Sequence, residues 1–256
     1  FLLNKKNRLK NEFKEKLKDR KKIINLQLEK NYDHLIFGSK DYANYYFLHT
    51  QTEKKFSIIP HGTQIASPLN KTKKNKINFI YTGGSILNKG WKIIENSFEY
   101  LLKKYSDTIC LRVYGDKKKT EKSKIGKFKN VEFFERYDHR NLNEILNWAD
   151  VGIIPSFFDT YNLFLRELIN YKVIPVSSNF FSASEIIKNN HNGIIMENND
   201  KINLVKSIEK IILNLNFRDN LFKNLCETKI ISVENEFEEL NKIYKGFKNT
   251  WNLLWK

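Results

Sequence analysis

From Ile77 to Met196 the sequence alternates short apolar runs with longer amphipathic runs. Within the longer runs, apolar residues recur three or four positions apart, as on one face of a helix. Short apolar strands separated by helices predict a parallel sheet that is covered on both faces. We therefore predict an α/β fold, a doubly wound and mostly parallel Rossmann-like sheet, followed by a helical C-terminus that begins near Asp200. The predicted strands are residues 77–81, 109–114, 131–134, 151–154, 173–177 and 193–196.

These strands end in residues that suit a ligand site. Gly83 and Gly84 follow the run 77–81, and a proline–serine pair follows the run 151–154. A glycine pair by itself is equally compatible with a plain turn. Because parallel sheets bind ligands at the carboxyl ends of their strands, we expect the chemistry in these two loops and in the loop after residues 109–114.

The segment 155–167 (PSFFDTYNLFLRE) is the most informative part of the chain. It follows a buried strand and opens a helix that we predict over residues 161–171. The N-terminus of a helix presents free N–H groups and the positive end of its dipole, which suits a diphosphate. Asp159 stands just before that helix. Glu167 lies almost two turns inside it, where a carboxylate can accept hydrogen bonds from both hydroxyls of a ribose.

Each of these residues also has a purely structural interpretation. Asp159 or Thr160 can serve as an ordinary N-cap of the helix. Glu167 can be a helix residue with a solvated carboxylate, although its apolar neighbours mean that the carboxylate needs a partner, either a ligand or a nearby lysine. The five histidines have no mutual spacing typical of a metal site. We interpret all of them as structural or surface residues: His34, His49, His61, His139 and His191.

The order of these motifs resembles the group 1 (family four) retaining glycosyltransferases of the two-Rossmann-domain (GT-B) type, mainly their C-terminal donor-binding domain. That family carries two Glu residues separated by seven positions after a Pro-Ser strand end, and here Asp159 and Glu167 keep the spacing. Residues 82–90 resemble its glycine-rich loop with a Lys-Gly pair, and residues 59–62 resemble the turn that ends its first domain. The resemblance covers roughly residues 33–215.

The resemblance implies a role for each candidate residue. Asp159 and Lys89 would be the catalytic residues, with Asp159 at the donor sugar and Lys89 at the diphosphate. The carboxylate at 167 would bind the ribose, residues 136–137 would line the base, and the amides near 162–163 would hold phosphate. The implied donor-binding residues are Gly83, Gly84, Arg136, Tyr137, Tyr161, Asn162, Leu163 and Glu167.

Three positions depart from the family pattern. Gly84 stands where the family usually has an arginine, five residues before the lysine, so one cation for the phosphates is missing. Asp159 is one methylene shorter than the usual Glu. Asn162 replaces the usual glycine, a mild change because Asn tolerates unusual backbone angles. These departures keep a second interpretation open, in which a degenerate glycosyltransferase fold binds nucleotide sugars or a partner without catalysis.

The resemblance favours an enzyme. It implies a transferase that moves a hexose-like sugar from a nucleoside diphosphate sugar to a glycan or lipid-linked acceptor, with retention of anomeric configuration, as in polysaccharide biosynthesis. No Asp-x-Asp pair occurs in the sequence, whereas metal-dependent glycosyltransferases commonly use such a pair to hold a metal on the diphosphate. We therefore expect no metal and no cofactor, with Lys89 and the helix dipole stabilising the leaving diphosphate.

The same resemblance divides the chain. Residues 233–256 carry apolar side chains three or four positions apart, which form a continuous apolar stripe on one helix face. The part of the stripe toward Trp251 and Trp255 is predicted to pack against the N-terminal segment 1–62, with a basic helix over residues 1–31 as its nearest partner. The chain begins with Phe1 instead of Met, so we expect a fragment with an incomplete first domain. The predicted parts are residues 1–68, the end of an acceptor-side domain; residues 69–232, the nucleotide-sugar-binding domain; and residues 233–256, a helix that crosses back to the N-terminal segment.

The 256 residues carry a formal net charge of +16 at pH 7, which bears on the partners. A general bias toward lysine explains much of this charge, and the seven lysines between 117 and 129 predict a solvated loop. Nucleic acid is not expected, because no recognition motif and no interleaving of aromatic and basic residues occurs. An anionic membrane surface is a further candidate partner, since residues 1–30 hold eleven Lys or Arg against four Asp or Glu.

Two further features bear on location. No run approaches the roughly 18 uninterrupted apolar residues of a membrane-spanning helix. Cys110 and Cys226 are far apart in the sequence, which predicts reduced core residues instead of a disulfide. We expect a cytoplasmic protein with, at most, peripheral contact with the inner face of the membrane.

Overall fold

The structure is a computed structural model that describes residues 34–50, 55–66 and 76–254, with side chains as far as residue 246. The chain divides into two compact units, residues 1–60 and 61–256. The first unit contributes a small strand pair, and the second contains the large sheet with its loops. The predicted basic helix 1–31 and Trp255 lie outside the described residues.

In the first unit, two short strands form a parallel pair, β1 (His34–Phe37) and β2 (Lys55–Ile58). Helix α2 (Lys40–Thr50) lies between them in the sequence. This helix begins where it does because the hydroxyl of Ser39 accepts a hydrogen bond from the N–H of Tyr42 at 3.1 Å, as an N-cap residue does.

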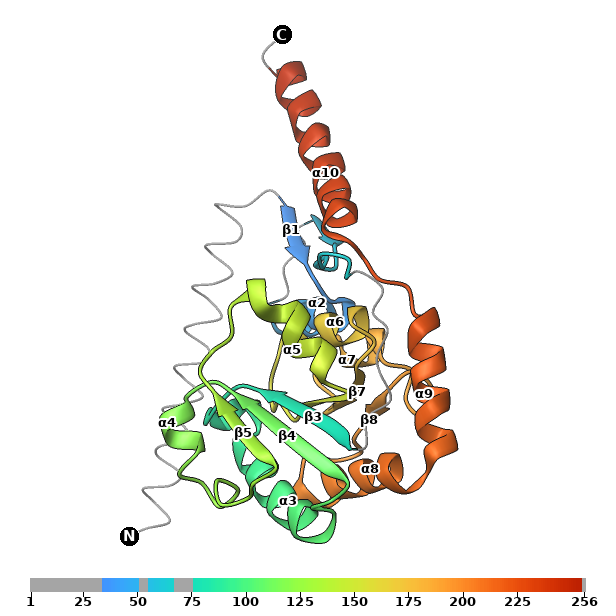
Figure 1. Ribbon diagram of the computed structural model, residues 1–256. Helices are drawn as coiled ribbons and strands as arrows, with labels where there is room; N and C mark the ends of the chain where they lie inside the picture. Colours follow the sequence, from blue (N-terminus) through green and yellow to red (C-terminus); the bar gives the residue numbers. More distant parts are fainter. Residues whose placement is uncertain (1–33, 51–54, 67–75, 255–256) are drawn as a thin grey trace, which may run out of the picture. The chain divides into compact units, whose positions relative to one another are not determined.

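The second unit contains a six-stranded sheet in which every neighbouring pair of strands is parallel. The strand order is β5-β4-β3-β6-β7-β8, so the chain adds strands outward from β3 in one direction and then from β6 in the other (Figure 1). This is the doubly wound arrangement that the sequence predicts. The strands are β3 (Ile77–Thr82), β4 (Ile109–Tyr114), β5 (Val131–Phe134), β6 (Val151–Ile154), β7 (Ile174–Ser177) and β8 (Ile194–Ile195).

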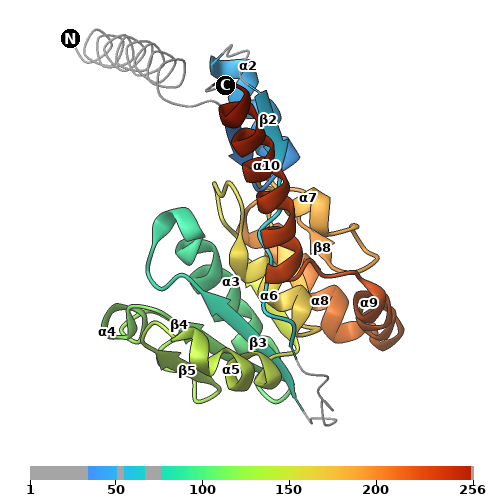
Figure 2. The ribbon, with the colours of Figure 1, turned by 90° about the horizontal axis from the view of Figure 1, so that it is seen from above.

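Helices cover both faces of this sheet (Figures 1 and 2). Helices α3 and α8 pack against each other on one face, while α6 packs against β6 and β7 on the other. Asp200 caps α8 by accepting from the N–H of Asn203 at 2.8 Å, which fixes where the helical C-terminus begins. The helices are η1 (Leu87–Lys89), α3 (Trp91–Lys104), α4 (Lys117–Thr120), η2 (His139–Asn141), α5 (Leu142–Trp148), α6 (Leu163–Asn170), α7 (Ala183–Ile186), α8 (Lys201–Leu213), α9 (Leu215–Glu227) and α10 (Val233–Leu254).

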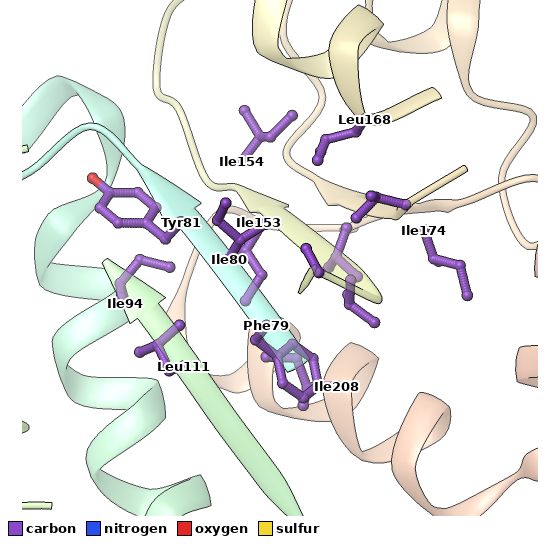
Figure 3. Packing of buried hydrophobic residues seen from close by; sticks show 14 of the residues in the cluster. Phe79, Ile80, Tyr81, Ile94, Leu111, Ile153, Ile154, Leu168, Ile174 and Ile208 are labelled. Carbon is purple, nitrogen blue, oxygen red and sulfur yellow. The ribbon is translucent and has the colours of Figure 1, made fainter. Parts of the chain in front are cut away.

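The core of the second unit lies around the central strand β3. Phe79, Ile80 and Tyr81 are all fully buried, although successive side chains of a strand point to opposite faces. Figure 3 shows Ile94 of α3 and Leu111 of β4 in the same cluster. An uninterrupted apolar strand is therefore required here, because both faces of β3 are covered.

Two sequence predictions about this unit are wrong. The lysine-rich segment is not simply a solvated loop, because it begins with helix α4 and buries Thr120 and Ile125 completely. The N–H of Lys124 also donates to the carboxylate of Glu95 at 3.2 Å. The cysteines are free, but Cys110 is only half-buried and Cys226 is exposed. Neither lies in the core, since every second residue of β4 at this end is only partly covered and position 226 lies in the last turn of α9.

The first turn of α10 is attached to the segment that enters the second unit. The Nδ1 atom of His61 lies 2.8 Å from one oxygen of Glu236, and the N–H of Gly62 donates to the other oxygen at 2.8 Å. The N–H of Thr63 donates to the carbonyl of Ile231 at 3.0 Å. Residues 61–63 and 231–236 therefore lie side by side.

The apolar stripe predicted along α10 is largely exposed where side chains are described. Phe237 is 62% exposed and Tyr244 is 60% exposed, while Leu240 is half-buried. The crossing contact with residues 1–31 depends on side chains outside the described part of the chain, so it stays a prediction. In the described ranges, no helix is both long enough and apolar enough to cross a membrane.

Candidate active site

The direction of strand addition reverses between β3 and β6, which are neighbours in the sheet. Strand β4 lies on the other side of β3, so the loops after β3, β4 and β6 meet at one edge. These are the three loops in which the sequence places the chemistry. Two adjoining cavities open there, of about 410 and 340 Å³, and both are lined by Thr82, Gly83 and Lys89.

The larger cavity has a wall made of backbone. Gly84 has a φ of +54°, and a Cβ at this position would lie 2.6 Å from the carbonyl oxygen of Gly115. The arginine that the resemblance leads one to expect at position 84 therefore cannot be present without moving the loop after β4. The cavity is lined by Thr82, Gly83, Gly84, Ile86, Lys89, Tyr114, Gly115, Asp116, Lys119, Arg136, Tyr137 and His139.

Cations outnumber anions in this cavity. Asp116 accepts a hydrogen bond from the hydroxyl of Ser85, and Lys119 Nζ lies 3.2 Å from the same carboxylate oxygen. These two contacts, the hydroxyl first, hold the pKa of Asp116 below its usual range, so that carboxylate is ionised. Against it stand Lys89, Lys119 and Arg136, and although Lys89 also contacts Asp159, a net positive charge remains that suits an anionic ligand.

The loop that carries Lys89 is locked to the loop that carries Asp159. Asn88 accepts from the N–H of Phe157 at 2.9 Å through its carbonyl, and its side-chain amide donates to the carbonyl of Phe158 at 3.2 Å. The Nζ atom of Lys89 lies 2.7 Å from Oδ2 of Asp159. The two residues that the resemblance names as catalytic are thus in direct contact, although 70 positions separate them.

The residue that begins helix α6 is Asn162. Its Oδ1 accepts from the N–H of Leu165 at 2.9 Å, so Asn162 is the N-cap, and the interpretation of Asp159 or Thr160 as the cap is wrong. The predicted helix start at 161 is wrong for the same reason, since the helix runs from Leu163. Asn162 has an ordinary extended backbone, with φ −86° and ψ 106°, so this position does not require a glycine.

Tyr161 lines the smaller cavity and joins it to the entry segment. Its hydroxyl donates to the carbonyl of His61 at 3.1 Å, and the guanidinium of Arg166 lies 5.2 Å from its ring centre. Burial raises the pKa of Tyr161 to about 12, so the hydroxyl stays protonated as a donor. The smaller cavity is lined by Tyr81, Thr82, Gly83, Lys89, Ile154, Ser156, Asp159, Tyr161, Asn162, Leu163 and Phe164.

Glu167 is buried in the second turn of α6 with only 6% of its surface exposed. Its partner is not a lysine, since the hydroxyl of Tyr137 donates to Oε2 at 3.1 Å and Nδ1 of His139 lies 3.3 Å from Oε1. Burial raises the pKa of Glu167 above its usual value, although the Tyr137 hydrogen bond and His139 act in the opposite direction. Burial and the adjacent carboxylate also raise the pKa of Tyr137.

The structure brings the predicted site residues together. All of them line one cavity or both, except Glu167, which contacts the wall of the larger cavity through Tyr137 and His139. Sequence reasoning missed Asp116 and Lys119, and it interpreted His139 only as a structural or surface residue. Asp116 had a signal, because it follows the end of a strand and a glycine, whereas one lysine in a lysine-rich run had none. Among the residues with described side chains, no group of three or more His, Cys, Asp or Glu could hold a metal ion.

This parallel sheet, with two adjoining cavities at its switch point, defines a Rossmann-like α/β domain. A sequence profile of the family described as Glycosyl transferases group 1 matches residues 64–226, well over half of the chain. The chain therefore belongs to the group 1 glycosyltransferase family, as the resemblance predicts.

Two curated relatives are similar in sequence. One is the GalNAc-alpha-(1->4)-GalNAc-alpha-(1->3)-diNAcBac-PP-undecaprenol alpha-1,4-N-acetyl-D-galactosaminyltransferase of Campylobacter jejuni, 29% identical over 46% of this chain and 33% of that protein. The other is an uncharacterised glycosyltransferase of Methanocaldococcus jannaschii, 26% identical over 82% of this chain and 57% of that protein. The chain thus spans about a third to a little over half of their lengths.

Solved structures share the fold at low sequence identity. Sucrose-phosphate synthase of Thermosynechococcus elongatus superposes with a TM-score of 0.76 at 16% identity, covering 91% of this chain and 62% of that one. HepE of Anabaena, in complex with UDP and glucose, gives a TM-score of 0.75 at 12% identity, covering 88% and 66%. TarM of S. aureus gives 0.73 at 18%, covering 87% and 46%. These likenesses support the GT-B type of fold.

Proposed function

We propose that this chain supplies the donor site of a retaining glycosyltransferase, which moves a sugar from a nucleoside diphosphate sugar to a glycan or lipid-linked acceptor. One observation carries the proposal. Lys89, Asp159 and the N-terminus of α6 meet where two cation-lined cavities adjoin. An elongated ligand with a diphosphate in its middle fits two connected cavities better than a compact ligand does.

The charges suggest how such a donor lies. The diphosphate would take the shared part of the cavities, between Lys89 and the free N–H groups at the start of α6. The base would lie against Arg136 and Tyr137 in the larger cavity, and Glu167 would accept from the ribose hydroxyls after displacing one of its present partners. The transferred sugar would then lie in the smaller cavity beside Asp159.

The chemistry follows from this placement. Breaking the bond between the sugar and the diphosphate leaves a positive, oxocarbenium-like sugar and a more negative diphosphate. Lys89 and the positive end of the α6 dipole would stabilise the departing diphosphate. Asp159 would stabilise the positive sugar from the other side. No step needs a metal, so we expect transfer to persist in EDTA.

The relatives support this assignment in kind. The crystal structure of HepE of Anabaena contains UDP and glucose. The name of the Campylobacter jejuni enzyme describes a substrate that is linked to undecaprenol diphosphate. By analogy, a nucleotide sugar is the donor class and a lipid-linked glycan is one acceptor class for this chain. The anionic face of the inner membrane would then be where it works, with the basic residues of 1–30 contributing about 1 kcal/mol each near that surface.

A non-catalytic binding module is the second candidate function. It is favoured by the position of Gly84, where the backbone leaves no room for the arginine expected of an active relative. Both functions predict nucleotide binding, but only the enzyme predicts turnover of the donor. Donor hydrolysis therefore separates them, because an active donor site transfers sugar slowly to water even without its acceptor.

The test begins with binding. We expect UDP or GDP to raise the melting temperature of the full chain, because a ligand that binds only the folded state stabilises it. Lys89→Ala should abolish this rise, whereas Lys103→Ala, an exposed lysine on α3, should not. Hydrolysis of UDP-glucose, UDP-N-acetylgalactosamine or GDP-mannose, with and without EDTA, then distinguishes an enzyme from a binding module. No thermal shift with any nucleotide would contradict both functions.

A separate sedimentation assay addresses the membrane surface. The chain should bind vesicles that contain phosphatidylglycerol and should release them at high salt, because exposed charges are screened there. Equal partitioning into anionic and neutral vesicles, or into neither, would remove the membrane surface from the proposal.

A further inference from the structure

The carboxylate of Asp159 is held by two donors at the same oxygen. Lys89 Nζ and Asn162 Nδ2 both lie 2.7 Å from Oδ2. The Asp159 side chain is only 12% exposed, so these contacts largely replace water. In the proposed function Lys89 also binds the donor diphosphate, and an ammonium drawn to a diphosphate loosens its contact with Asp159.

The other donor is fixed in its orientation. A backbone N–H can only donate, so the atom of Asn162 that accepts from Leu165 at 2.9 Å is the carboxamide oxygen. The carboxamide nitrogen must then face Asp159. Asn162 is itself 7% exposed, so little water competes for either contact. One buried side chain thus joins the carboxylate to the first turn of α6.

We propose that Asn162 is a positioning residue for the reaction: it holds the Asp159 carboxylate toward the sugar cavity while Lys89 turns to the diphosphate. The proposal rests on the proposed function. It explains how a short carboxylate acts here. Aspartate has one rotatable bond fewer than glutamate, so its carboxylate reaches fewer positions. A neighbouring side chain with a fixed orientation therefore has to orient the carboxylate toward the sugar.

Two variants separate positioning from helix capping. Asn162→Ser keeps a good N-cap but replaces the amide nitrogen that faces Asp159 with a hydroxyl on a shorter side chain. Asn162→Asp keeps both the cap and the shape while replacing the donor with a carboxylate. The matched control is Asn214, which caps α9 through its Oδ1 at 2.9 Å from the N–H of Phe217 and lies in an exposed position. The substitutions Asn214→Ser and Asn214→Asp repeat the capping change away from the site.

The measurements are kcat, KM, the UDP dissociation constant and the pH–rate profile. The donor is whichever of UDP-glucose, UDP-N-acetylgalactosamine and GDP-mannose the wild-type chain hydrolyses. We expect Asn162→Ser to bind UDP as the wild type does, whereas the added carboxylate of Asn162→Asp should weaken UDP binding by repelling the diphosphate. Both variants should lose on the order of 100-fold in kcat, the cost of about 1 Å of misplacement. Asn162→Asp should also move the acid limb of the profile to higher pH, because neighbouring carboxylates oppose each other's ionisation.

The outcomes are distinct. Wild-type kcat in a folded Asn162→Asp or Asn162→Ser variant overturns the positioning role while leaving the proposed function intact. The role is also overturned if Asn162→Ser lowers kcat and UDP affinity by similar factors and lowers the melting temperature as much as Asn214→Ser does. That pattern would show that only helix capping is lost. If Asn162→Ser fails to fold, the pH profile of Asn162→Asp decides. No hydrolysis of any donor by the wild-type chain overturns the proposed function and this role together.

Discussion

The two cavities of the candidate active site are built from different materials. Where β3 and β4 end, the wall of the larger cavity is backbone, with Gly84 and Gly115 too close for any side chain between them. At the start of α6, the wall of the smaller cavity is a chain of side chains in which Lys89, Asp159 and Asn162 meet at 2.7 Å. The backbone wall can change only if a loop moves, whereas the side-chain wall can change one atom at a time.

This difference agrees with what each wall would contact. In the proposed function the backbone wall lies beside the diphosphate and nucleoside, which vary little among nucleotide sugars. The side-chain wall lies beside the transferred sugar, which varies most. We therefore expect substitutions in the backbone wall to cost stability and binding together, and substitutions in the side-chain wall to cost turnover with the fold intact.

The largest effect should come from Gly84→Arg, which restores the cation that the family resemblance leads one to expect. The new side chain meets the carbonyl of Gly115 and a left-handed backbone, which cost roughly 1–3 kcal/mol for the strained backbone and a similar amount for overpacking. Despite the added charge, UDP affinity should fall. Urea unfolding and calorimetry measure both effects.

The control for this change is another glycine. Gly246→Ala on α10 meets nothing within 4 Å, so it should stabilise the helix by roughly 0.5–1 kcal/mol. A Gly84→Arg variant that keeps its stability and binds UDP more tightly would show that the backbone wall is adaptable, and the contrast between the walls would fail.

Asp159→Asn should have the next largest effect, on the order of 100-fold in kcat or about 2.7 kcal/mol in the barrier. The neutral amide no longer offers a negative charge to the positive sugar, while UDP affinity should change little. Steady-state hydrolysis measures kcat, and calorimetry on the same preparation measures the affinity for UDP. If the variant turns over normally, the side-chain wall has no catalytic part. Because Asn162 holds the N-cap, a lower melting temperature cannot be ascribed to lost capping by Asp159.

Glu167→Ala should cost at least tenfold in nucleotide affinity. Hydrogen bonds to a charged group contribute roughly 1.5–3 kcal/mol each, and a ribose offers two donors. Comparing UDP with uridine monophosphate should show the same loss for both, since both carry the ribose, and calorimetry gives the two constants. Unchanged affinity in a folded variant would place the ribose elsewhere.

Glu167→Gln should have the smallest effect, a rise in melting temperature of a few degrees at neutral pH. Burial raises the pKa of Glu167 in the folded state, so ionisation costs the fold stability as the pH rises through the carboxylate range. The neutral amide removes that cost. Well below the ordinary pKa of a glutamate, Glu167 is protonated in both the folded and the unfolded state, and the gain should disappear.

Glu99→Gln is the matched control for this pH dependence. Its pKa is held below the usual value, chiefly by a hydrogen bond from Lys103 on the surface of α3. Removing that carboxylate should therefore lower the melting temperature slightly or leave it unchanged at neutral pH. A rise in both variants would mean that the net charge of the chain, and not the burial of Glu167, is responsible.

The sheet could be predicted from the sequence because each of its strands is a short apolar run. A strand covered on both faces, such as β3, must be apolar at every position, and a short run of that kind is visible without a structure. The order of the strands could not be predicted, since parallel strands joined by similar helices do not reveal on which side of β3 each is added. That the three loops after β3, β4 and β6 meet could nevertheless be predicted, because the carboxyl ends of parallel strands lie at the same edge of the sheet.

The candidate site residues could be predicted where a position requires one residue type. They could not be predicted where the role of a residue depends on its contacts in the fold. The glycines at 83 and 84 and the carboxylate spacing were visible in the sequence. That Asn162 both caps α6 and holds Asp159 was not, because an N-cap and a loop residue look alike before the helix start is known. His139 was misinterpreted for a similar reason, since only the fold brings it to Glu167.

The attachment of Thr63 to Ile231 has a consequence for the evolution of such proteins. It brings the point where the chain enters the second unit next to the point where the chain leaves the sheet for α10. A folded region whose two ends adjoin can be spliced into a host, exchanged between genes or circularly permuted without stretching its connections. The second unit could therefore be exchanged between genes as a whole, and under the proposed function one such event would pair a donor site with a new acceptor site.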